Sequence, residues 1–158
     1  MKLNDIIVRD AVIANLNAVE RDDVIGEMVD AIIAANVAKP AMRDELVRAI
    51  LEREKKGSTG FGKGVAVPHV KHKAISKMCA TIGLSARGVD FNALDRQPVY
   101  SVFLLLSPED RPEEHLLAME VIFKNLSQER FRRFLRQAST VPEVLTLIDE
   151  ADAQGFPG

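Results

Sequence analysis

Residues 99–106 read VYSVFLLL and form the most hydrophobic strand candidate in the chain. Pro98 precedes this run, and Ser107-Pro108 ends it. A strand whose successive residues are apolar, rather than alternate ones, is typical of a strand that is covered on both faces. The run therefore predicts the central strand of a sheet with helices on both sides.

Shorter apolar segments lie on either side of this run in the sequence. Helical spacing, as in Val24, Ile25, Met28 and Val29, predicts amphipathic helices, whereas short apolar runs predict further strands. We expect strands at 11–16, 65–67 and 78–84, a loop at 85–95, helices at 21–35, 41–55, 110–126, 128–137 and 140–150, and a docked helix or arm at 3–8. Such interleaving predicts a three-layer α/β sandwich, in which crossover helices favour parallel strand pairs.

Bulk properties are those of one globular domain spanning residues 1–158, since this length suits a single core. The net charge of −2 gives no basic footprint for nucleic acid. No apolar stretch approaches the roughly twenty residues of a membrane span, and the charged N-terminus is unlike a signal peptide. The single cysteine, Cys79, fits a reducing compartment and a buried position. We therefore expect a cytoplasmic protein without nucleic-acid binding or membrane insertion.

The richest chemistry lies in residues 58–73, which read STGFGKGVAVPHVKHK. Glycines at 60, 62 and 64 let backbone N–H groups approach a ligand closely, which suggests a cradle for an anion. Pro68 should end the short strand at 65–67 and so present His69 at a strand end, where α/β proteins commonly place ligand sites.

Other interpretations of this segment compete with that one. A lone histidine is often structural, and a glycine-rich turn is often only a turn. Residues 57–64, GSTGFGKG, also come within one residue of the nucleotide-binding pattern G-x-x-x-x-G-K-[ST]. However, Gly64 stands where a magnesium-binding hydroxyl is required, and the loop follows an expected helix rather than a strand. These two departures disfavour an ATP or GTP site.

A family resemblance is carried by Arg53-Glu54, by the segment 57–69 and by Glu113-Glu114-His115-Leu116. Together these motifs resemble the enzyme IIA domains of the fructose and mannitol class of the bacterial phosphoenolpyruvate-dependent sugar phosphotransferase system (PTS). That class includes the stand-alone nitrogen-regulatory enzyme IIA proteins. The resemblance extends from about residue 3 to residue 148 and implies a mixed, mostly parallel sheet.

The resemblance implies a histidine phosphocarrier in which His69 is the phosphorylated residue. His115 matches the second histidine of the family and is expected to hydrogen-bond the imidazole or phosphoryl group of His69. Arg53 matches the family's arginine, and a guanidinium suits phosphate oxygens because it donates paired, charge-assisted hydrogen bonds. From position alone, Arg53 would only complement a helix C-terminus.

Hydroxyl and backbone donors of Ser58, Thr59 and Gly60 are expected to help bind the phosphoryl group, with turn capping as the alternative for the two hydroxyls. Val70 departs from the small residue that the family usually has after the active histidine. His72, between two lysines, is expected in a solvated basic turn. Asp90 and Asp95 flank a turn, and side-chain bonding to the turn explains them better than catalysis does.

Two functions from different classes remain open at this point. In the first, His69 accepts a phosphoryl group from phospho-HPr or its nitrogen-branch homologue and passes it to an enzyme IIB-type acceptor or uses it as a signal. In the second, the protein is a non-transferring binding module that controls a kinase, transporter or transcription regulator. Neither function requires a cofactor, and three scattered histidines with one cysteine predict no metal site.

Overall fold

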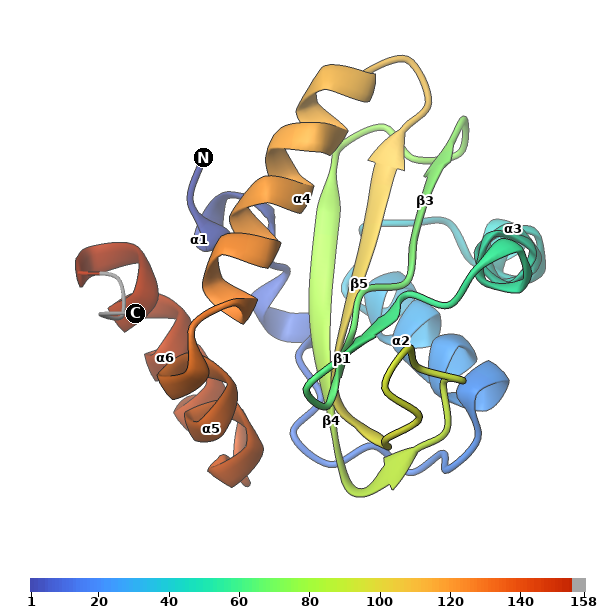
Figure 1. Cartoon of the computed structure of the whole chain (residues 1–158). Coiled ribbons are helices and arrows are strands. Elements are labelled where there is room, and N and C mark those ends of the chain that lie inside the picture. The colour runs from blue at the N-terminus through green and yellow to red at the C-terminus, as the bar shows by residue number, and fades with distance from the viewer. Residues whose placement is uncertain (155–158) are drawn as a thin grey trace.

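The protein is an α/β sandwich of three layers, seen edge-on in Figure 1. A computed structural model describes residues 1–154. One mixed sheet forms the middle layer. Helices α2 (Arg21–Ala34) and α3 (Arg43–Lys56) cover one face, while α1 (Leu3–Ile6), α4 (Pro112–Leu126), α5 (Glu129–Gln137) and α6 (Val141–Gln154) cover the other. The predicted fold class is confirmed.

Strand β5 (Val99–Pro108) is the centre of the sheet, as its sequence predicts. It pairs in antiparallel fashion with β4 (Cys79–Val89) along one edge. Along the other edge it pairs in parallel with β2 (Val65–Ala66) and β3 (His69–His72). Strand β1 (Gly60–Gly62) forms a hairpin with β2. Alternate side chains of β5 enter two separate cores, one beneath each helical layer.

Strands β2 and β3 are two parts of one line along β5, interrupted at Val67-Pro68. Val65 lies opposite Ser101, and His69 lies opposite Leu105, so the register is the same on both sides of the break. Proline cannot donate to the ladder, which explains the interruption. The expectation that the strand stops before His69 is therefore wrong in one respect, because His69 is the first residue of β3.

Three local predictions are also wrong. Residues 11–16 are not a strand: a 3-10 helix covers Arg9–Ala11, and the chain then meets β4 through an isolated bridge at Ile13 and one backbone hydrogen bond from Leu16. The expected loop at 85–95 begins five residues later than its bounds suggest, because β4 continues to Val89. Helix α4 starts after Arg111 rather than after Asp110, and no side chain caps it.

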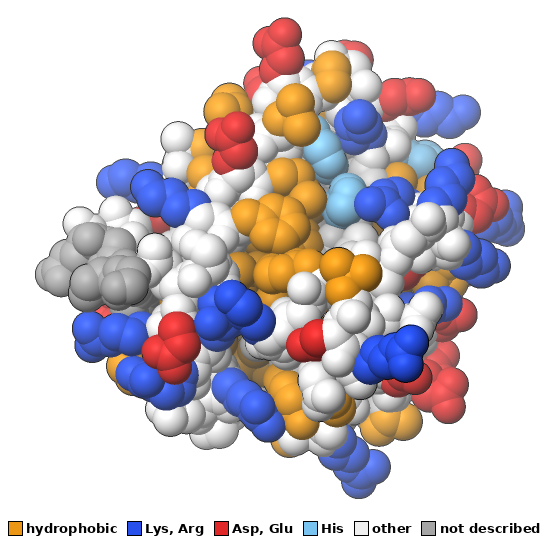
Figure 2. All heavy atoms as spheres, viewed as in Figure 1, with side chains coloured by type: hydrophobic (Ala, Val, Ile, Leu, Met, Phe, Trp, Pro, Cys, Tyr) orange, Lys and Arg blue, Asp and Glu red, His pale blue; other side chains and the backbone are white. Residues whose placement is uncertain are grey.

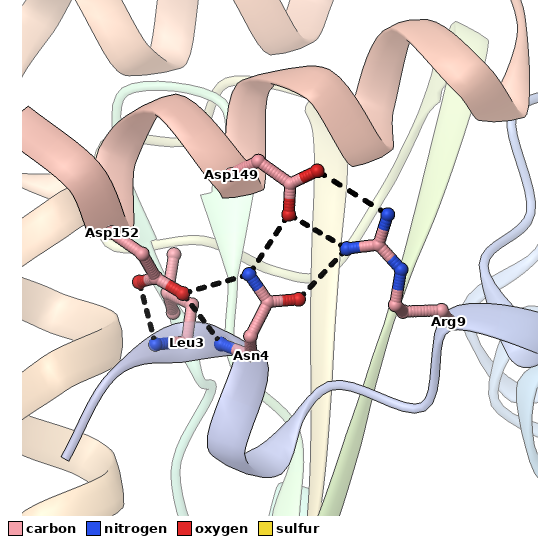
Figure 3. A network of polar contacts seen from close by, with 5 residues as sticks. All are labelled: Leu3, Asn4, Arg9, Asp149 and Asp152. Atoms are coloured by element: carbon pink, nitrogen blue, oxygen red, sulfur yellow. Dashed lines mark hydrogen bonds and ion pairs between the residues drawn. The ribbon is translucent and has the colours of Figure 1, made fainter.

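The first and last described helices are joined by a polar network, shown in Figure 3. The Asp152 carboxylate accepts hydrogen bonds from the backbone N–H groups of Leu3 and Asn4, both at 2.8 Å. The Asp149 carboxylate accepts from the Arg9 guanidinium at 2.7 Å and from the Asn4 amide at 2.9 Å. Two carboxylates of α6 thus hold α1 and the segment after it against the outer layer.

Candidate functional site

His69 is held by its own backbone neighbourhood at the start of β3. Its Nδ1 lies 2.7 Å from the carbonyl oxygen of Val67. A carbonyl can only accept, so Nδ1 carries the proton and donates it to this bond. The other ring nitrogen, Nε2, then has a lone pair when the ring is neutral. This geometry prepares Nε2 to act as a nucleophile.

His115 lies beside His69, although 46 positions separate them in the numbering of the chain. It sits in the first turns of α4 and is 7% exposed. The centroids of the two imidazole rings are 5.5 Å apart, and the ring planes are tilted by 47°. The Nδ1 atom of His115 lies 2.7 Å from the hydroxyl oxygen of Ser107, which is fully buried on β5.

Arg53 approaches the same place from the last turn of α3. One of its Nη atoms donates to the carbonyl of Gly57 at 3.0 Å, which fixes the guanidinium at the helix end. The other donors remain for a ligand. Arg53, His69 and His115 line one open cavity of about 460 Å³, together with Ala49, Glu52, Lys56, Val70 and Lys71. The cavity wall is therefore richer in cations than in carboxylates.

Burial and nearby cations keep both imidazoles neutral at neutral pH. The pKa of His69 is lowered from its ordinary value of 6.5, mainly by burial and also by the positive charges of Arg53 and Lys71. The bond to the Val67 carbonyl and the Glu54 carboxylate oppose this shift. The pKa of His115 falls to about 4 because of burial and the neighbouring charges of His69 and Lys71. His69 is consequently available as a neutral nucleophile.

The structure brings together Arg53, His69 and His115, but it engages Ser58, Thr59 and Gly60 elsewhere. The Ser58 hydroxyl donates to the Phe91 carbonyl at 2.6 Å and accepts from the Gly60 N–H at 3.0 Å. The Thr59 N–H and hydroxyl both donate to the Glu54 carboxylate, at 2.9 and 2.6 Å. In this conformation these groups shape the loop, which is the capping alternative given above for the two hydroxyls.

Two side chains near the site were not predicted from the sequence. Glu54, only 3% exposed, anchors the glycine loop beneath the cavity. Ser107 contacts His115 from inside the sheet. Glu54 belongs to the Arg53-Glu54 motif, which gives it no role of its own, and a serine after an apolar run is common on surfaces. Only the pairing of Glu54 with Thr59 and of Ser107 with His115 reveals them.

His72 and the two candidate carboxylates have structural roles. His72 Nδ1 accepts from the Ala74 N–H at 2.9 Å, and Nε2 lies 3.7 Å from the Glu45 carboxylate. Asp90 accepts from the N–H of Asn92, and Asp95 from the N–H groups of Gln97 and Lys63. The predicted turn bonding of both aspartates is confirmed. The expected solvated position of His72 is wrong, because its side chain is only 12% exposed.

An apolar patch adjoins the two histidines. The rings of Phe61 and Phe123 pack at a tilt of 57° with centroids 4.8 Å apart, and Leu116 and Leu117 are 63% and 49% exposed. Figure 2 shows apolar side chains gathered on this face next to histidine side chains. Exposed apolar groups that gather beside a reactive side chain are typical of a protein-docking surface.

Residues 1–154 lack the features of two other classes of protein. They contain no group of three or more His, Cys, Asp or Glu side chains that could hold a metal ion. Within the same residues, no helix has the length and apolar character needed to cross a bilayer. Cys79 is 2% exposed, and burial raises the pKa of its thiol to about 12. A thiol in this state is unreactive, as expected for a buried filler.

Comparison with protein families gives one match along most of the chain. The family model of the phosphoenolpyruvate-dependent sugar phosphotransferase system, EIIA 2, matches residues 5–151. The chain is 35% identical over 121 residues to the fructose-specific EIIA component of the PTS of Haloferax volcanii, covering 75% of this chain and 79% of that protein. It is 29% identical over 150 residues to the nitrogen regulatory protein of Bradyrhizobium diazoefficiens, covering 94% of this chain and 95% of that protein.

Longer proteins and solved structures extend this comparison. The fructose-specific EIIABC component of Bacillus subtilis is 32% identical over 152 residues, but the chain spans only 24% of its length. Among solved structures, the nitrogen regulatory protein IIA-Ntr of Neisseria meningitidis superposes with a TM-score of 0.81 at 26% identity, covering 90% of this chain and 96% of that one. IIA mannitol of Escherichia coli superposes with a TM-score of 0.73 at 22% identity. The match covers 88% of this chain and 96% of that one, so the two share the fold.

Proposed function

The chain belongs to the EIIA 2 family of the phosphoenolpyruvate-dependent sugar phosphotransferase system, and from this membership we propose that it is a histidine phosphocarrier that is phosphorylated on Nε2 of His69. The observation that carries this proposal is the bond from His69 Nδ1 to the Val67 carbonyl. It leaves Nε2 as the nucleophilic nitrogen in a cavity that also contains Arg53 and His115.

The proposed step transfers a phosphoryl group between two imidazoles. The Nε2 lone pair of His69 forms a new N–P bond while the N–P bond of a donor phosphohistidine breaks, and the electron pair of that bond returns to the donor ring. The Nδ1 proton of His69 stays in its bond to the Val67 carbonyl, which stabilises the phosphorylated ring as an imidazolium. The donor ring, protonated on its other nitrogen, leaves as a neutral imidazole, so the step needs no separate base. The same step in reverse passes the group to an acceptor.

Arg53 and His115 have distinct roles in this step. Phosphoryl transfer is promoted mainly by alignment and by neutralisation of charge on the equatorial oxygens. The free donors of Arg53 supply positive charge beside those oxygens. If the Ser107 hydroxyl donates to Nδ1 of His115, the proton of the neutral ring lies on Nε2, where it can donate to the phosphoryl group. A neutral His115 can donate one hydrogen bond to the phosphoryl group without placing a further positive charge beside Arg53 and the His69 ring.

The apolar patch of Phe61, Leu116, Leu117 and Phe123 supports transfer between proteins rather than to a small molecule. We expect phosphorylated HPr or a nitrogen-branch homologue as the donor, and an enzyme IIB-type protein as one acceptor. A solved complex of enzyme IIA mannitol with phosphorylated enzyme IIB mannitol from Escherichia coli has the same fold as this chain, at a TM-score of 0.73 and 21% identity. Such donors obtain their phosphate from phosphoenolpyruvate, so we expect the proposed reaction to take place in the cytoplasm.

A regulatory role is the second candidate. It is favoured by the likeness to nitrogen regulatory proteins along nearly their whole length, for example 95% of the Bradyrhizobium protein. In this case a phosphate on His69 would place negative charge beside the apolar patch. This charge would make or break an interface with a partner protein, and the phosphoryl group would not be passed on. The two candidates share the phosphorylation of His69 and differ only in whether the phosphoryl group is then passed on.

The test is intact-mass analysis after incubation with phosphoenolpyruvate, enzyme I and HPr, and in parallel with the nitrogen-branch homologues of both. The wild type should gain one acid-labile phosphoryl group, and His69→Ala should gain none. His72→Ala is the matched control, since it removes a histidine from the same strand outside the cavity and should be phosphorylated normally. Phosphorylation of His69→Ala, or none of the wild type with either set, would overturn the assignment.

A further inference from the structure

A second cavity, of about 350 Å³, lies at the other end of the central strand. Ser101, which lines it, precedes Leu105, the partner of His69, by four residues on β5. Four residues of a strand correspond to about 13 Å, so Ser101 lies about that far along β5 from the residue opposite His69. The volume is at the lower end of the range for small-molecule sites.

Three cations line this cavity: Lys63, Arg132 and Arg136. Arg132 and Arg136 are four residues apart on α5 and therefore share one helix face. Among residues 1–154, no carboxylate lies within ion-pair distance of any of the three. The cavity thus concentrates three positive charges against one lining carboxylate, Asp95, in a protein whose net charge is −2.

Both arginines are held in place by contacts that do not cancel their charge. The Arg136 guanidinium lies 3.6 Å from the centroid of the Tyr100 ring. At that distance the guanidinium stacks on the ring and keeps the N–H donors at its edge available. Arg132 uses one Nη atom to donate to the Leu126 carbonyl at 2.7 Å. Fixed guanidinium groups with free donors are pre-organised for a phosphate or carboxylate.

The rest of the lining restricts the ligand further. Asp95 and Gln97 contribute oxygen acceptors, and Tyr100 and Pro98 contribute apolar surface. Both carboxylate oxygens of Asp95 are already fixed by backbone N–H groups, those of Gln97 and Lys63. The Asp95 carboxylate would repel a second anionic group of a ligand, but its oxygens can accept hydrogen bonds from the ligand's hydroxyls. A ligand that is anionic at one end and hydroxyl-bearing at the other therefore fits the lining best.

We propose that the cavity between α5 and the β1–β2 hairpin binds a small phosphorylated, hydroxyl-bearing metabolite, whose phosphate is held by Arg132 and Arg136. The site is separate from His69, so this inference stands independently of the phosphocarrier assignment. The lower part of the face in Figure 2 carries Lys and Arg side chains below the apolar patch, in agreement with a basic site away from the histidines.

The test uses ribose 5-phosphate, inorganic phosphate and ribose as probes of the full-length chain. In ¹⁵N NMR titrations, ribose 5-phosphate should shift the amides of Gly64, Tyr100 and Ser101 saturably, with a Kd of roughly 1 mM or below. Inorganic phosphate should bind more weakly, and ribose should leave these signals unchanged. Equal binding of inorganic phosphate would overturn the metabolite assignment, and no saturable shift would overturn the site.

Variants separate a built site from diffuse charge. Arg132→Gln and Arg136→Gln should each raise the Kd for ribose 5-phosphate at least about tenfold, the loss expected for a charge-assisted hydrogen-bonding group. Arg130→Gln is the matched control on the same helix, because Arg130 contacts Phe134 and does not line the cavity. It should leave the Kd within about twofold. An equal loss in Arg130→Gln, or binding abolished by Arg53→Gln, would contradict the proposal.

Discussion

The reactivity proposed for His69 depends on which of its nitrogens carries a proton and on the charge of its neighbours. The ring must be neutral to attack, and its pKa lies below 6.5 because of burial and the charge of Arg53. Acidification through that lowered pKa protonates Nε2 and removes the lone pair. Arg53 therefore acts twice in the proposal: it keeps the nucleophile neutral, and it stabilises the transferred group.

The first prediction concerns Arg53→Gln. The rate of phosphoryl acceptance by the wild type should be constant above neutral pH and should fall to half at a pH below 6.5. In Arg53→Gln this midpoint should move to higher pH, because a cation that disfavours the imidazolium is gone. The plateau rate should fall about tenfold or more through lost charge stabilisation. Rapid-quench phosphorylation gives the rate, and NMR titration of the His69 ring gives the pKa.

Arg48→Gln is the control for this experiment, since Arg48 is an exposed cation of the same helix that does not line the cavity. It should change neither the midpoint nor the plateau. An unchanged midpoint and plateau in Arg53→Gln would reduce Arg53 to a residue that complements the end of α3.

The second prediction concerns the contact from Ser107 to His115. Ser107→Ala removes the hydroxyl that fixes the tautomer and orientation of His115. We expect the rate of phosphoryl acceptance to fall about fivefold, the kinetic equivalent of about 1 kcal/mol for one hydrogen bond. The ¹⁵N shifts of the His115 ring should also change, a readout that a purely structural role would not move. Ser101→Ala, another buried serine of β5, should leave both unchanged.

The candidate site could be predicted from the sequence only where a residue had a motif around it. His69 follows the glycine loop and Pro68, and His115 follows the Glu113-Glu114 pair, so both carry local patterns. Ser107 lacks such a pattern, and the Arg53-Glu54 motif does not reveal what Glu54 does, because both roles depend on partners that only the fold brings near. The loop hydroxyls illustrate the opposite error. Ser58 and Thr59 have the right chemistry for a phosphate, but the structure uses them to close the loop.

At the level of whole elements, the prediction succeeds where one pattern dominates a segment. The apolar run at 99–106 identifies the central strand, and helical spacing identifies α2 and α3. Residues 11–16 have strand-like composition, yet Ile13 and Leu16 only bond intermittently to the free edge of β4. Gly88 suggests a loop, but it lies at a register shift inside β4 with φ of 87°. Edge pairing and bulges depend on neighbouring strands, so the segment's own sequence does not specify them.

The third prediction concerns the turn between β1 and β2. Lys63 and Gly64 form its two central residues with φ of 62° and 78°, the left-handed conformation that a two-residue hairpin requires. A lysine in this region is strained, whereas glycine is not. Lys63→Gly should raise the free energy of unfolding by about 0.5–1 kcal/mol, measured by urea denaturation. Lys63→Val, with a β-branched side chain, should lower it, and the opposite order would contradict this account.

Across the whole molecule, the network in Figure 3 connects the two ends of the described chain on the layer that also contains His115. Asp152 accepts from two backbone N–H groups at the start of α1, which have no partner within so short a helix. It acts as a helix cap supplied from a distant part of the sequence. Both side chains of the Arg9–Asp149 ion pair are exposed to solvent, so dissolved salt screens their attraction. The two carboxylates should therefore contribute unequally to stability.

The last prediction compares Asp152→Asn with Asp149→Asn. An asparagine at 152 keeps one acceptor oxygen but places an amide group against a backbone donor, so the free energy of unfolding should fall by about 1–2 kcal/mol. Asp149→Asn should destabilise less, and its effect should shrink when sodium chloride is raised from about 0.05 to about 0.5 M, because its first partner is the exposed guanidinium of Arg9 and salt screens an exposed ion pair. Urea denaturation of both variants at the two salt concentrations measures this. Equal losses, or a loss in Asp152→Asn that salt abolishes, would mean that Asp152 acts through charge rather than by accepting from the first N–H groups of α1.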